Sequence, residues 1–163
     1  MLRETYDSLT KRLLEETRRH YGERLVSFVL FGSVARGTMR PDSDIDVLIV
    51  AELLPQGRMP RMREFDAVEF ALAAELSAAA KAGVHALLSP VIKTSNEVRY
   101  GSPLFLDMTL EARILHDKDG FFAAYLEGLR ARMKALGSVR KELAGGYYWV
   151  LKPDWKPGEE IVL

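Results

Sequence analysis

Two short apolar runs separated by a polar loop restrict the fold of this chain more than any other feature. The first run is LVSFVLF, Leu25–Phe31, and the second is IDVLIV, Ile45–Val50. Both are short and rich in β-branched residues, which is typical of strands that are buried in a sheet. The loop begins with Gly32 and Ser33, and the segment DSDID leads into the second run. The sequence therefore predicts two neighbouring strands joined through a polar site.

Helical periodicity and one further apolar run surround these strands. Val84–Thr94 reads as a third strand, and Pro90 within it indicates a bulge or a sheet edge because proline lacks a ladder donor. The segment 51–60 is predicted to be a loop because it contains two prolines and a glycine. The segments with helical spacing or composition are Leu2–His20, Arg61–Gly83, Pro103–Leu115 and Asp119–Leu136.

These elements predict an α/β (α+β) fold with a small mixed sheet, mainly of three strands, flanked by helices. Residues 1–137 would form one domain, since 163 residues are enough to bury a single core. Residues 138–163 would form a C-terminal extension that continues from the last helix. It is rich in aromatic residues, proline and glycine, and is expected to be irregular or to contain one short strand. It either packs on the domain or forms a subunit interface.

The composition excludes several classes of function. There are 23 basic and 23 acidic residues, so no global attraction to nucleic acid or to a membrane is expected. The absence of cysteine excludes disulfides, thiolate catalysis and Cys-ligated zinc. The three histidines are scattered and predict no zinc site. No apolar run approaches the roughly 20 residues of a membrane span, and we expect a cytoplasmic protein.

Two aspartates at the start of the second apolar run are the first candidate site residues. Asp44 and Asp46 would point to the same face of a strand, opposite to Ile45 and Val47. Neighbouring carboxylates repel each other unless a cation lies between them, and Mg²⁺ or Mn²⁺ prefers such oxygen ligands. The alternative is an ordinary turn with aspartates as turn formers, which suits Asp42 but not an aspartate inside an apolar run.

The preceding loop has the chemistry of a phosphate site. Gly32 lets a phosphate approach the backbone, and the Ser33 hydroxyl can donate a hydrogen bond to it. Gly37 would let the chain leave a short helix, and the Arg36 guanidinium suits phosphate geometry. Arg36 could equally be a solvated loop residue. The loop is not a Walker A motif, because the Gly-Lys-[Ser/Thr] ending is absent.

The segment GSVARG followed by DSDID resembles the Gly-Ser-x-x-x-Gly, Asp-x-Asp signature of the polymerase-β nucleotidyltransferase superfamily, in particular its minimal nucleotidyltransferases. The later segments SPVIKTSNEV, PLFLDMTLEARILHDKDGFF and YYWVLKPDWKPGE are similar to longer minimal members. The resemblance implies transfer of a nucleoside monophosphate from an NTP, ATP before others, to an acceptor. Asp44 and Asp46 would be the catalytic metal ligands.

The same resemblance implies the ligands and partners of such a protein. Mg²⁺ or Mn²⁺ would be the cofactor, and Gly32, Ser33, Arg36 and Gly37 would form the nucleotide site. The partner would be a small helical HEPN protein in a toxin–antitoxin pair, and a homo-oligomer is also possible. Nucleic acid is not expected as a partner.

The chain departs from the superfamily pattern at the third carboxylate, which is expected on the third strand. VHALLSPVIKT contains no Asp or Glu, and Ser89 occupies the expected place. Glu69, His85 or Glu97 could substitute for it. Two hypotheses therefore stay open: an active nucleotidyltransferase, or a catalytically weakened module that binds a partner as an antitoxin or regulatory subunit. Transfer to a small molecule such as an aminoglycoside is a third hypothesis, but the sequence identifies no acidic pocket for a cationic drug.

Overall fold

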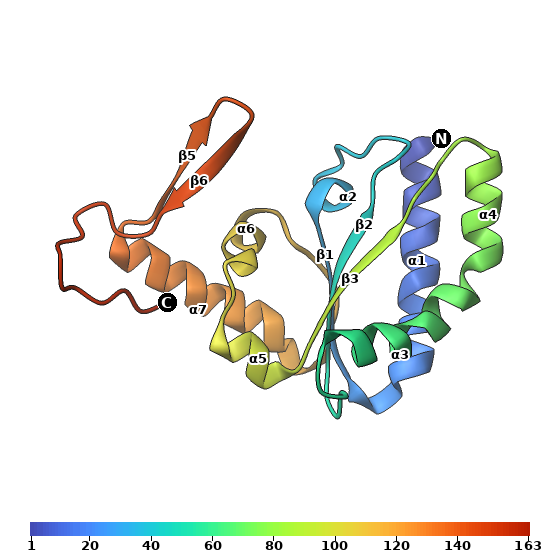
Figure 1. Cartoon of the computed structure of the whole chain (residues 1–163), viewed down its shortest axis with the longest axis horizontal. Helices are drawn as coiled ribbons and strands as arrows, with labels where there is room; N and C mark the ends of the chain where they lie inside the picture. The colour runs from blue at the N-terminus through green and yellow to red at the C-terminus, as the bar shows by residue number, and fades with distance from the viewer.

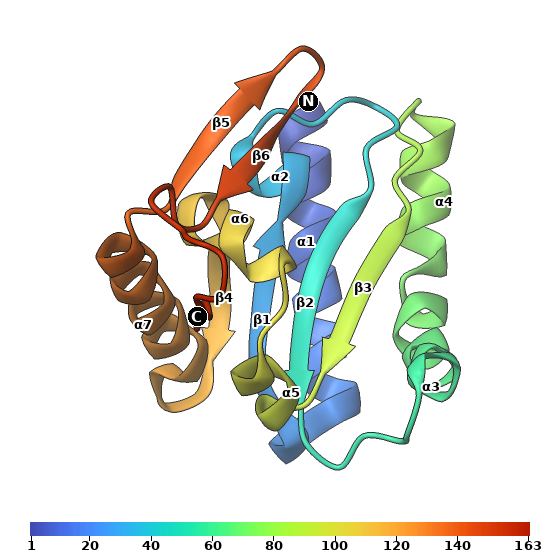
Figure 2. The same cartoon turned by 60° about the vertical axis from the view of Figure 1, so that its left-hand side comes forward.

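The computed structural model describes all residues, 1–163, and contains a mixed four-stranded sheet. The strand order is β3-β2-β1-β4, in which β1 is antiparallel to both of its neighbours and β2 is parallel to β3 (Figure 2). The strands are β1 Leu25–Phe31, β2 Ile45–Ala51, β3 Leu88–Lys93 and β4 Arg113–Asp117. The two predicted strands at the polar loop are confirmed as adjacent central strands.

Helices cover both faces of this sheet (Figure 1). On one face lie α1 Leu2–Tyr21, α3 Arg58–Ala71 and α4 Ala73–Lys81; on the other lie α5 Ser95–Tyr100, α6 Leu104–Glu111 and α7 Phe121–Leu136. The short helix α2, Gly32–Arg36, lies at the end of β1, and 3₁₀ turns form at Gly22–Arg24 and Lys118–Gly120. The mixed sheet flanked by helices is therefore confirmed.

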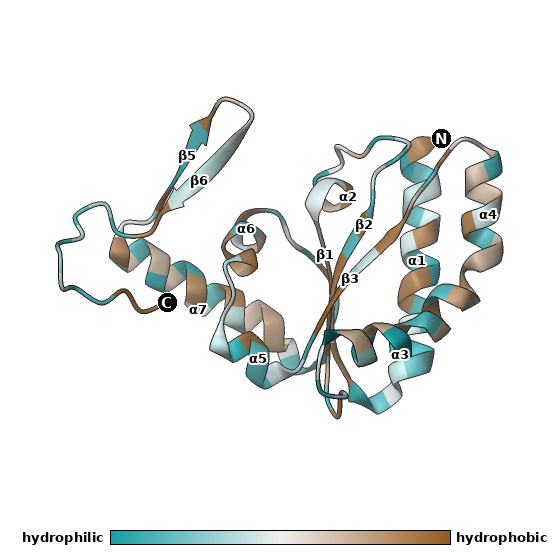
Figure 3. Ribbon diagram, in the orientation of Figure 1, coloured by the Kyte–Doolittle hydropathy of each residue, from teal (hydrophilic) through white to brown (hydrophobic).

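Two hydrophobic cores, one on each face of the sheet, explain the near-continuous apolar strands. Alternate residues of β2 enter opposite cores: Val47 and Ile49 pack toward α1 and α3, and Leu48 and Val50 pack toward α5, α6 and α7. The largest fully buried side chains include Phe28 and Phe65 in the first core, and Phe105 and Phe122 in the second. Each such side chain contributes roughly 1.5–3 kcal/mol by leaving water. Figure 3 shows apolar residues on the central strands and on the helices that flank them.

The fourth strand was not predicted from the sequence. The helix expected over Pro103–Leu115 ends at Glu111, and the following residues pair with β1 from Ser27 to Leu30 as β4. Ile114 and Leu115 fit helical spacing as well as strand alternation. Pairing with the open edge of β1 makes this segment a strand rather than a helix. The prediction of mainly three strands was therefore wrong by one strand.

The long helix predicted over Arg61–Gly83 is divided into α3 and α4. The break occurs at Leu72, whose backbone leaves helical geometry with φ −95° and ψ 0°. Leu72 is fully buried in the first core, so the two short helices meet at a residue that packs into that core. Composition alone predicts continuous helix here because alanine, leucine and glutamate all favour it.

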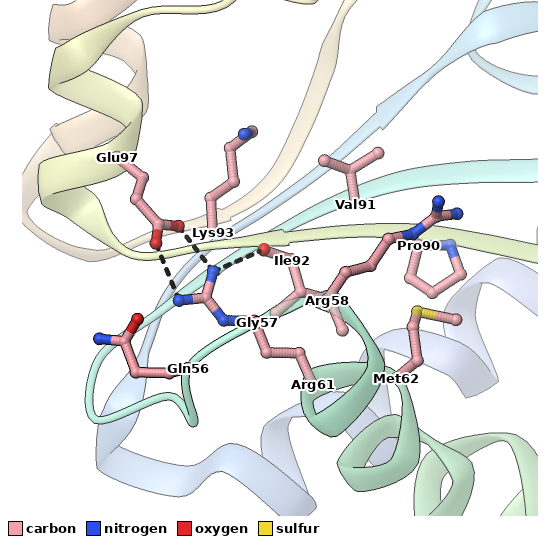
Figure 4. A pocket seen from close by; sticks show the side chains of 10 residues that line it. All are labelled: Gln56, Gly57, Arg58, Arg61, Met62, Pro90, Val91, Ile92, Lys93 and Glu97. Atoms are coloured by element: carbon pink, nitrogen blue, oxygen red, sulfur yellow. Dashed lines mark hydrogen bonds and ion pairs between the residues drawn. The ribbon is translucent and has the colours of Figure 1, made fainter.

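The third strand lies at a sheet edge, as Pro90 predicted, but it is shorter than Val84–Thr94. Arg61 of α3 lies beside this edge and donates a hydrogen bond to the Ile92 carbonyl at 3.3 Å (Figure 4). The same guanidinium binds both carboxylate oxygens of Glu97 at 2.7 and 2.8 Å. Pro90 and Arg61 thus protect an edge that would otherwise offer free backbone groups to another strand.

The C-terminal extension contains two strands instead of the irregular chain or single short strand that was predicted. β5 Val139–Leu143 pairs with β6 Gly146–Val150 as an antiparallel hairpin that projects beyond α7 (Figure 1). The Trp149 indole donates a hydrogen bond to Asp107 of α6 at 2.9 Å, and Arg140 stacks over Tyr147 at 4.5 Å.

None of the helices is both long and apolar enough to cross a membrane.

Candidate active site

The loop GSVARG forms a turn of helix directly at the end of β1. α2 spans Gly32–Arg36, and Gly37 ends it in the left-handed conformation with φ 75°. Its amide donates to the carbonyls of Ser33 and Val34. A short helix after a strand, closed by a glycine, is what the sequence predicted. Ser33 is partly exposed at the first turn of this helix, next to the start of β2.

Gly32 has a role that sequence reasoning missed. Its φ is 71°, and a Cβ atom added there would lie 2.3 Å from the Asp46 carboxylate oxygen Oδ2. Any side chain at this position would therefore displace the aspartate. We predicted that Gly32 lets a phosphate approach, whereas the structure shows that it also makes room for Asp46. The glycine of the loop and the second aspartate of DSDID are thus packed against each other.

The two aspartates differ in their surroundings. Asp44 is exposed just before β2, and Asp46 is half-buried within it. Asp46 is opposite Ser89 in the parallel register of β2 and β3, so their side chains lie on the same face. Burial raises the pKa of Asp46, the nearby Ser89 hydroxyl lowers it and the Asp44 charge raises it; the net pKa is above its ordinary value. This is the electrostatic setting that a cation would relieve.

Arg36 lies between the aspartates and α6. Its charge lowers the pKa of Asp46, and its Nη1 forms an ion pair with Glu111 Oε1 at 3.1 Å. Arg36 is therefore neither a free phosphate ligand nor a fully solvated loop residue in this structure. The sequence contains no signal for Glu111, because its place beside the loop depends on how α6 packs against α2.

The loop that leads to the aspartates is held by Tyr6, another residue that sequence reasoning missed. The buried Tyr6 ring lies in α1, and its hydroxyl donates toward the carbonyls of Arg40 at 3.0 Å and Ser43 at 2.7 Å. Ser43 Oγ in turn accepts a hydrogen bond from the Arg40 amide at 2.8 Å. Asp42 is exposed, as expected for a turn residue, and its Oδ1 lies 3.6 Å from Nε of Arg40. These contacts set the direction in which Asp44 enters β2.

The structure brings none of the three candidate substitutes into a carboxylate cluster with the aspartates. Glu97 follows Lys93 in the chain and binds Arg61. In the register of β2 and β3, Lys93 is opposite Val50, whereas Ser89 is opposite Asp46. The two pairs are four positions apart along the strands, which is about 13 Å. Glu69 is exposed on α3, and His85 is exposed in the segment beside DSDID, where its amide donates to Pro41 at 2.7 Å. No three Asp, Glu, His or Cys side chains gather anywhere to hold a metal.

The donor set nevertheless fits a divalent cation that is shared with a substrate. Two carboxylates at a solvent-facing strand end suit Mg²⁺, which usually takes one or two protein carboxylates and completes its shell with phosphates and water. Asp44 and Asp46 supply these carboxylates, and α2 lies where phosphates would approach. The site thus has the parts for one shared cation, but not for a cation that the protein alone surrounds.

Comparison with known proteins assigns the chain to the same kind of enzyme family as the motifs GSVARG and DSDID do. The family model described as nucleotidyltransferase domain matches residues 10–116, more than half of the chain. The chain belongs to this nucleotidyltransferase family. The matched segment includes α2, both aspartates, Ser89 and Glu111, and it ends before α7 and the hairpin. Asp44 and Asp46 therefore lie within the nucleotidyltransferase domain.

A curated relative and two solved structures are similar to this nucleotidyltransferase. "Putative protein adenylyltransferase MJ1305" of Methanocaldococcus jannaschii is 27% identical over 135 residues, which cover 82% of this chain and 86% of the relative. A crystal structure of a toxin-antitoxin with AMP-PNP is 20% identical with a TM-score of 0.46. A crystal structure of a mutant of the toxin-antitoxin MntA-HpeT is 19% identical with a TM-score of 0.49. Each alignment covers 77% of this chain and 89% of the solved chain.

Proposed function

We propose that this nucleotidyltransferase transfers a nucleoside monophosphate, AMP from ATP, to an acceptor in a reaction that depends on Mg²⁺ or Mn²⁺. The observation that carries the proposal is the contact of Gly32 with Asp46, because it joins the phosphate loop to the carboxylates. A nucleotide whose phosphates lie on α2 would have its α-phosphate beside Asp44 and Asp46. The family match supports the reaction class.

In this proposal each residue of the site has a separate role. Asp44 and Asp46 hold the cation, which supplies charge stabilisation to the phosphates when it is bound. Ser33 and the amides of α2 bind the β- and γ-phosphates, and Arg36 moves from Glu111 toward them. The acceptor hydroxyl attacks the α-phosphorus, the bond to pyrophosphate breaks, and the hydroxyl proton is released to water. Gly37 ends α2 so that Arg36 lies next to the site.

The acceptor in this proposal is a hydroxyl-bearing side chain of a HEPN-type partner in a toxin–antitoxin pair. The name of the relative MJ1305 refers to a protein acceptor, which supports this class over a small molecule. Residues 1–137 would be the transferring unit, and 138–163 the extension that contacts the partner or a second copy. The exposed Tyr148 and Leu143 of the hairpin suit such contact. The proposal includes a cytoplasmic location, where NTPs are available.

Ser89 favours a second candidate function. A serine opposite Asp46 is a poor metal ligand and no general base at neutral pH. A protein with this site could bind nucleotide and a partner while doing little chemistry, as an antitoxin or regulatory subunit. Under this reading, changes of the aspartates would leave partner binding unaltered, whereas removal of residues 145–163 would weaken it.

The test is label transfer from ATP labelled at the α-phosphate, with lysate of the host as the source of acceptor. The proposal expects a labelled protein with wild type and none with the Asp44→Asn, Asp46→Asn double variant, in Mg²⁺ or Mn²⁺. The identity of the labelled species names the acceptor. Equal labelling by the variant would refute the assignment of the aspartates. Binding of ATP without any labelling would favour the second candidate.

A further inference from the structure

A small cavity behind α2 is lined by three arginines from three different elements. It has a volume of about 240 Å³ and lies against the C-terminal end of α2, on the side of α1 and β4. Arg3 comes from α1, Arg36 from α2 and Arg113 from the first residue of β4. The remaining lining residues are Asp7, Val34, Ala35, Gly37 and Met39.

The charge of this cavity is not balanced by the fold. Asp7 is its one lining carboxylate and Glu111 pairs with Arg36 from outside the lining, so the three guanidinium groups leave a net charge of +1. Neither Arg3 nor Arg113 has an ion pair, whereas Arg36 has one with Glu111. Arginine stays protonated at every accessible pH, so these like charges cannot be relieved by loss of a proton. An anion that enters the cavity would relieve them.

The backbone leaves room for this arrangement at Gly37. A Cβ atom added to Gly37 would lie 2.5 Å from Nη2 of Arg3, so the absence of a side chain here lets this guanidinium lie against the end of α2 as it does. The contact places Arg3 beside Arg36, although the two residues are far apart in the sequence. Arg113 of β4 is paired with Leu30 of β1, and Leu30 lies next to the end of the strand that leads into α2. Arg113 therefore reaches the same cavity.

We infer that Arg3, Arg36 and Arg113 form a binding site for a compact phosphate anion. Guanidinium groups match phosphate oxygens with paired hydrogen bonds, and a cavity of this size suits one or two phosphoryl groups rather than a whole nucleotide. Arg36 belongs both to this cavity and to the proposed nucleotide site. The anion is therefore either the terminal phosphates of the substrate, a source that rests on the proposed function, or a free phosphate beside it.

The inference is tested by calorimetric titration of the full chain with inorganic pyrophosphate and with inorganic phosphate, in buffer that contains EDTA. Arg3→Gln and Arg113→Gln should each weaken pyrophosphate binding about tenfold, the loss of one charged hydrogen bond. Both residues are exposed, so neither change should prevent folding. The matched control is Arg63→Gln, because Arg63 is exposed on α3, has no ion pair and lies outside the cavity. It should leave binding unchanged.

Three results would overturn the inference: no binding of either anion at millimolar concentration, equal binding by the two variants and wild type, or an equal loss in the Arg63 control. If pyrophosphate binds, a titration in the presence of ATP identifies the source of the anion. Competition between ATP and pyrophosphate assigns the cavity to the terminal phosphates, and simultaneous binding assigns it to a free phosphate. Because EDTA removes the cation, Asp44→Asn with Asp46→Asn should retain pyrophosphate binding. Failure of label transfer and failure of this site are therefore distinguishable.

Discussion

Both ends of the central strands carry carboxylates, but those at one end have no ion pair and those at the other end are paired with basic residues. At the end where β2 begins, Asp44 has no ion pair and Asp46 is half-buried beside it. At the end where β3 finishes, Glu97 binds Arg61, and Glu64 binds both Arg24 and His20. Carboxylates that the fold pairs stabilise the fold, whereas carboxylates that it leaves close together and unpaired are available to a ligand. Under the proposed function, this difference separates the end of the sheet that binds substrate from the end that stabilises the fold.

Ser89→Asp is expected to have a large effect, because it adds a carboxylate to the unpaired end. If the third carboxylate is what this chain lacks, the rate of nucleotidyl transfer should rise about a hundredfold, the typical contribution of a positioned general base. The variant should also be less stable, because a third negative charge joins Asp44 and Asp46. Initial rates with labelled ATP measure the effect, and Ser89→Asn is the control of equal shape. A rate for the aspartate variant that does not exceed that of the asparagine variant would show that catalysis does not need this position.

Arg61→Ala tests the paired end. The Arg61 side chain is only 11% exposed and holds Glu97, Ile92 and the Pro55 carbonyl, so its loss leaves several polar groups without partners. We expect the free energy of unfolding to fall by about 2 kcal/mol. Nucleotidyl transfer by the folded fraction should stay unchanged. Urea denaturation and the transfer assay measure the two quantities.

The control for this change is Arg58→Ala, because Arg58 begins the same helix and lines the pocket between α3 and β3 together with Arg61, but has no ion pair (Figure 4). It should change stability by less than about 0.5 kcal/mol. A loss of transfer in Arg61→Ala that is larger than the loss of folded protein would contradict the separation of the two ends.

Glu64→Gln gives the smallest expected effect and has a pH signature. Hydrogen bonding to Arg24 lowers the pKa of Glu64 below its ordinary value, with a further contribution from His20 at 3.0 Å. A carboxylate with a lowered pKa in the folded state stabilises the fold above its ordinary pKa, and this stability is lost as pH falls through the folded-state value. At pH 7 the variant should therefore be about 1 kcal/mol less stable than wild type.

Denaturation at several pH values checks this prediction. The difference between wild type and variant should shrink as the pH falls below 4.5 and vanish in stronger acid. Glu23→Gln serves as the control, because Glu23 is exposed and unpaired and its removal should change little at any pH. A difference that stays constant across the acidic range would mean that Glu64 stabilises the fold by packing rather than by charge.

The sequence predicted what depends on neighbours along the chain. β1, the turn into α2, the left-handed Gly37 and the start of β2 all follow from local apolar runs and turn chemistry. The sequence also shows that the third strand has no carboxylate, whereas the pairing of Ser89 with Asp46 follows only from the register of β2 and β3.

What the sequence could not predict depends on contacts between distant segments. β4 forms because β1 has an open edge, and the C-terminal hairpin lies against α6 through Trp149 and Asp107. Tyr6 holds the aspartate loop from a helix more than 30 residues away, and Glu111 meets Arg36 only after α6 has packed. These residues have no motif of their own, so only the fold reveals that they belong to the site.

Single aspartate variants from the same loop test the roles of Asp44 and Asp46 most directly. Transfer from α-labelled ATP to the identified acceptor is measured for Asp44→Asn, Asp46→Asn and Asp42→Asn, with intact folding checked for each. We expect the first two variants to lose at least about a thousandfold in rate, because each removes a ligand of the shared cation. Asp42→Asn should keep the wild-type rate, because Asp42 is an exposed turn residue. Equal rates for all three variants would contradict the assignment of the unpaired end as the site of transfer.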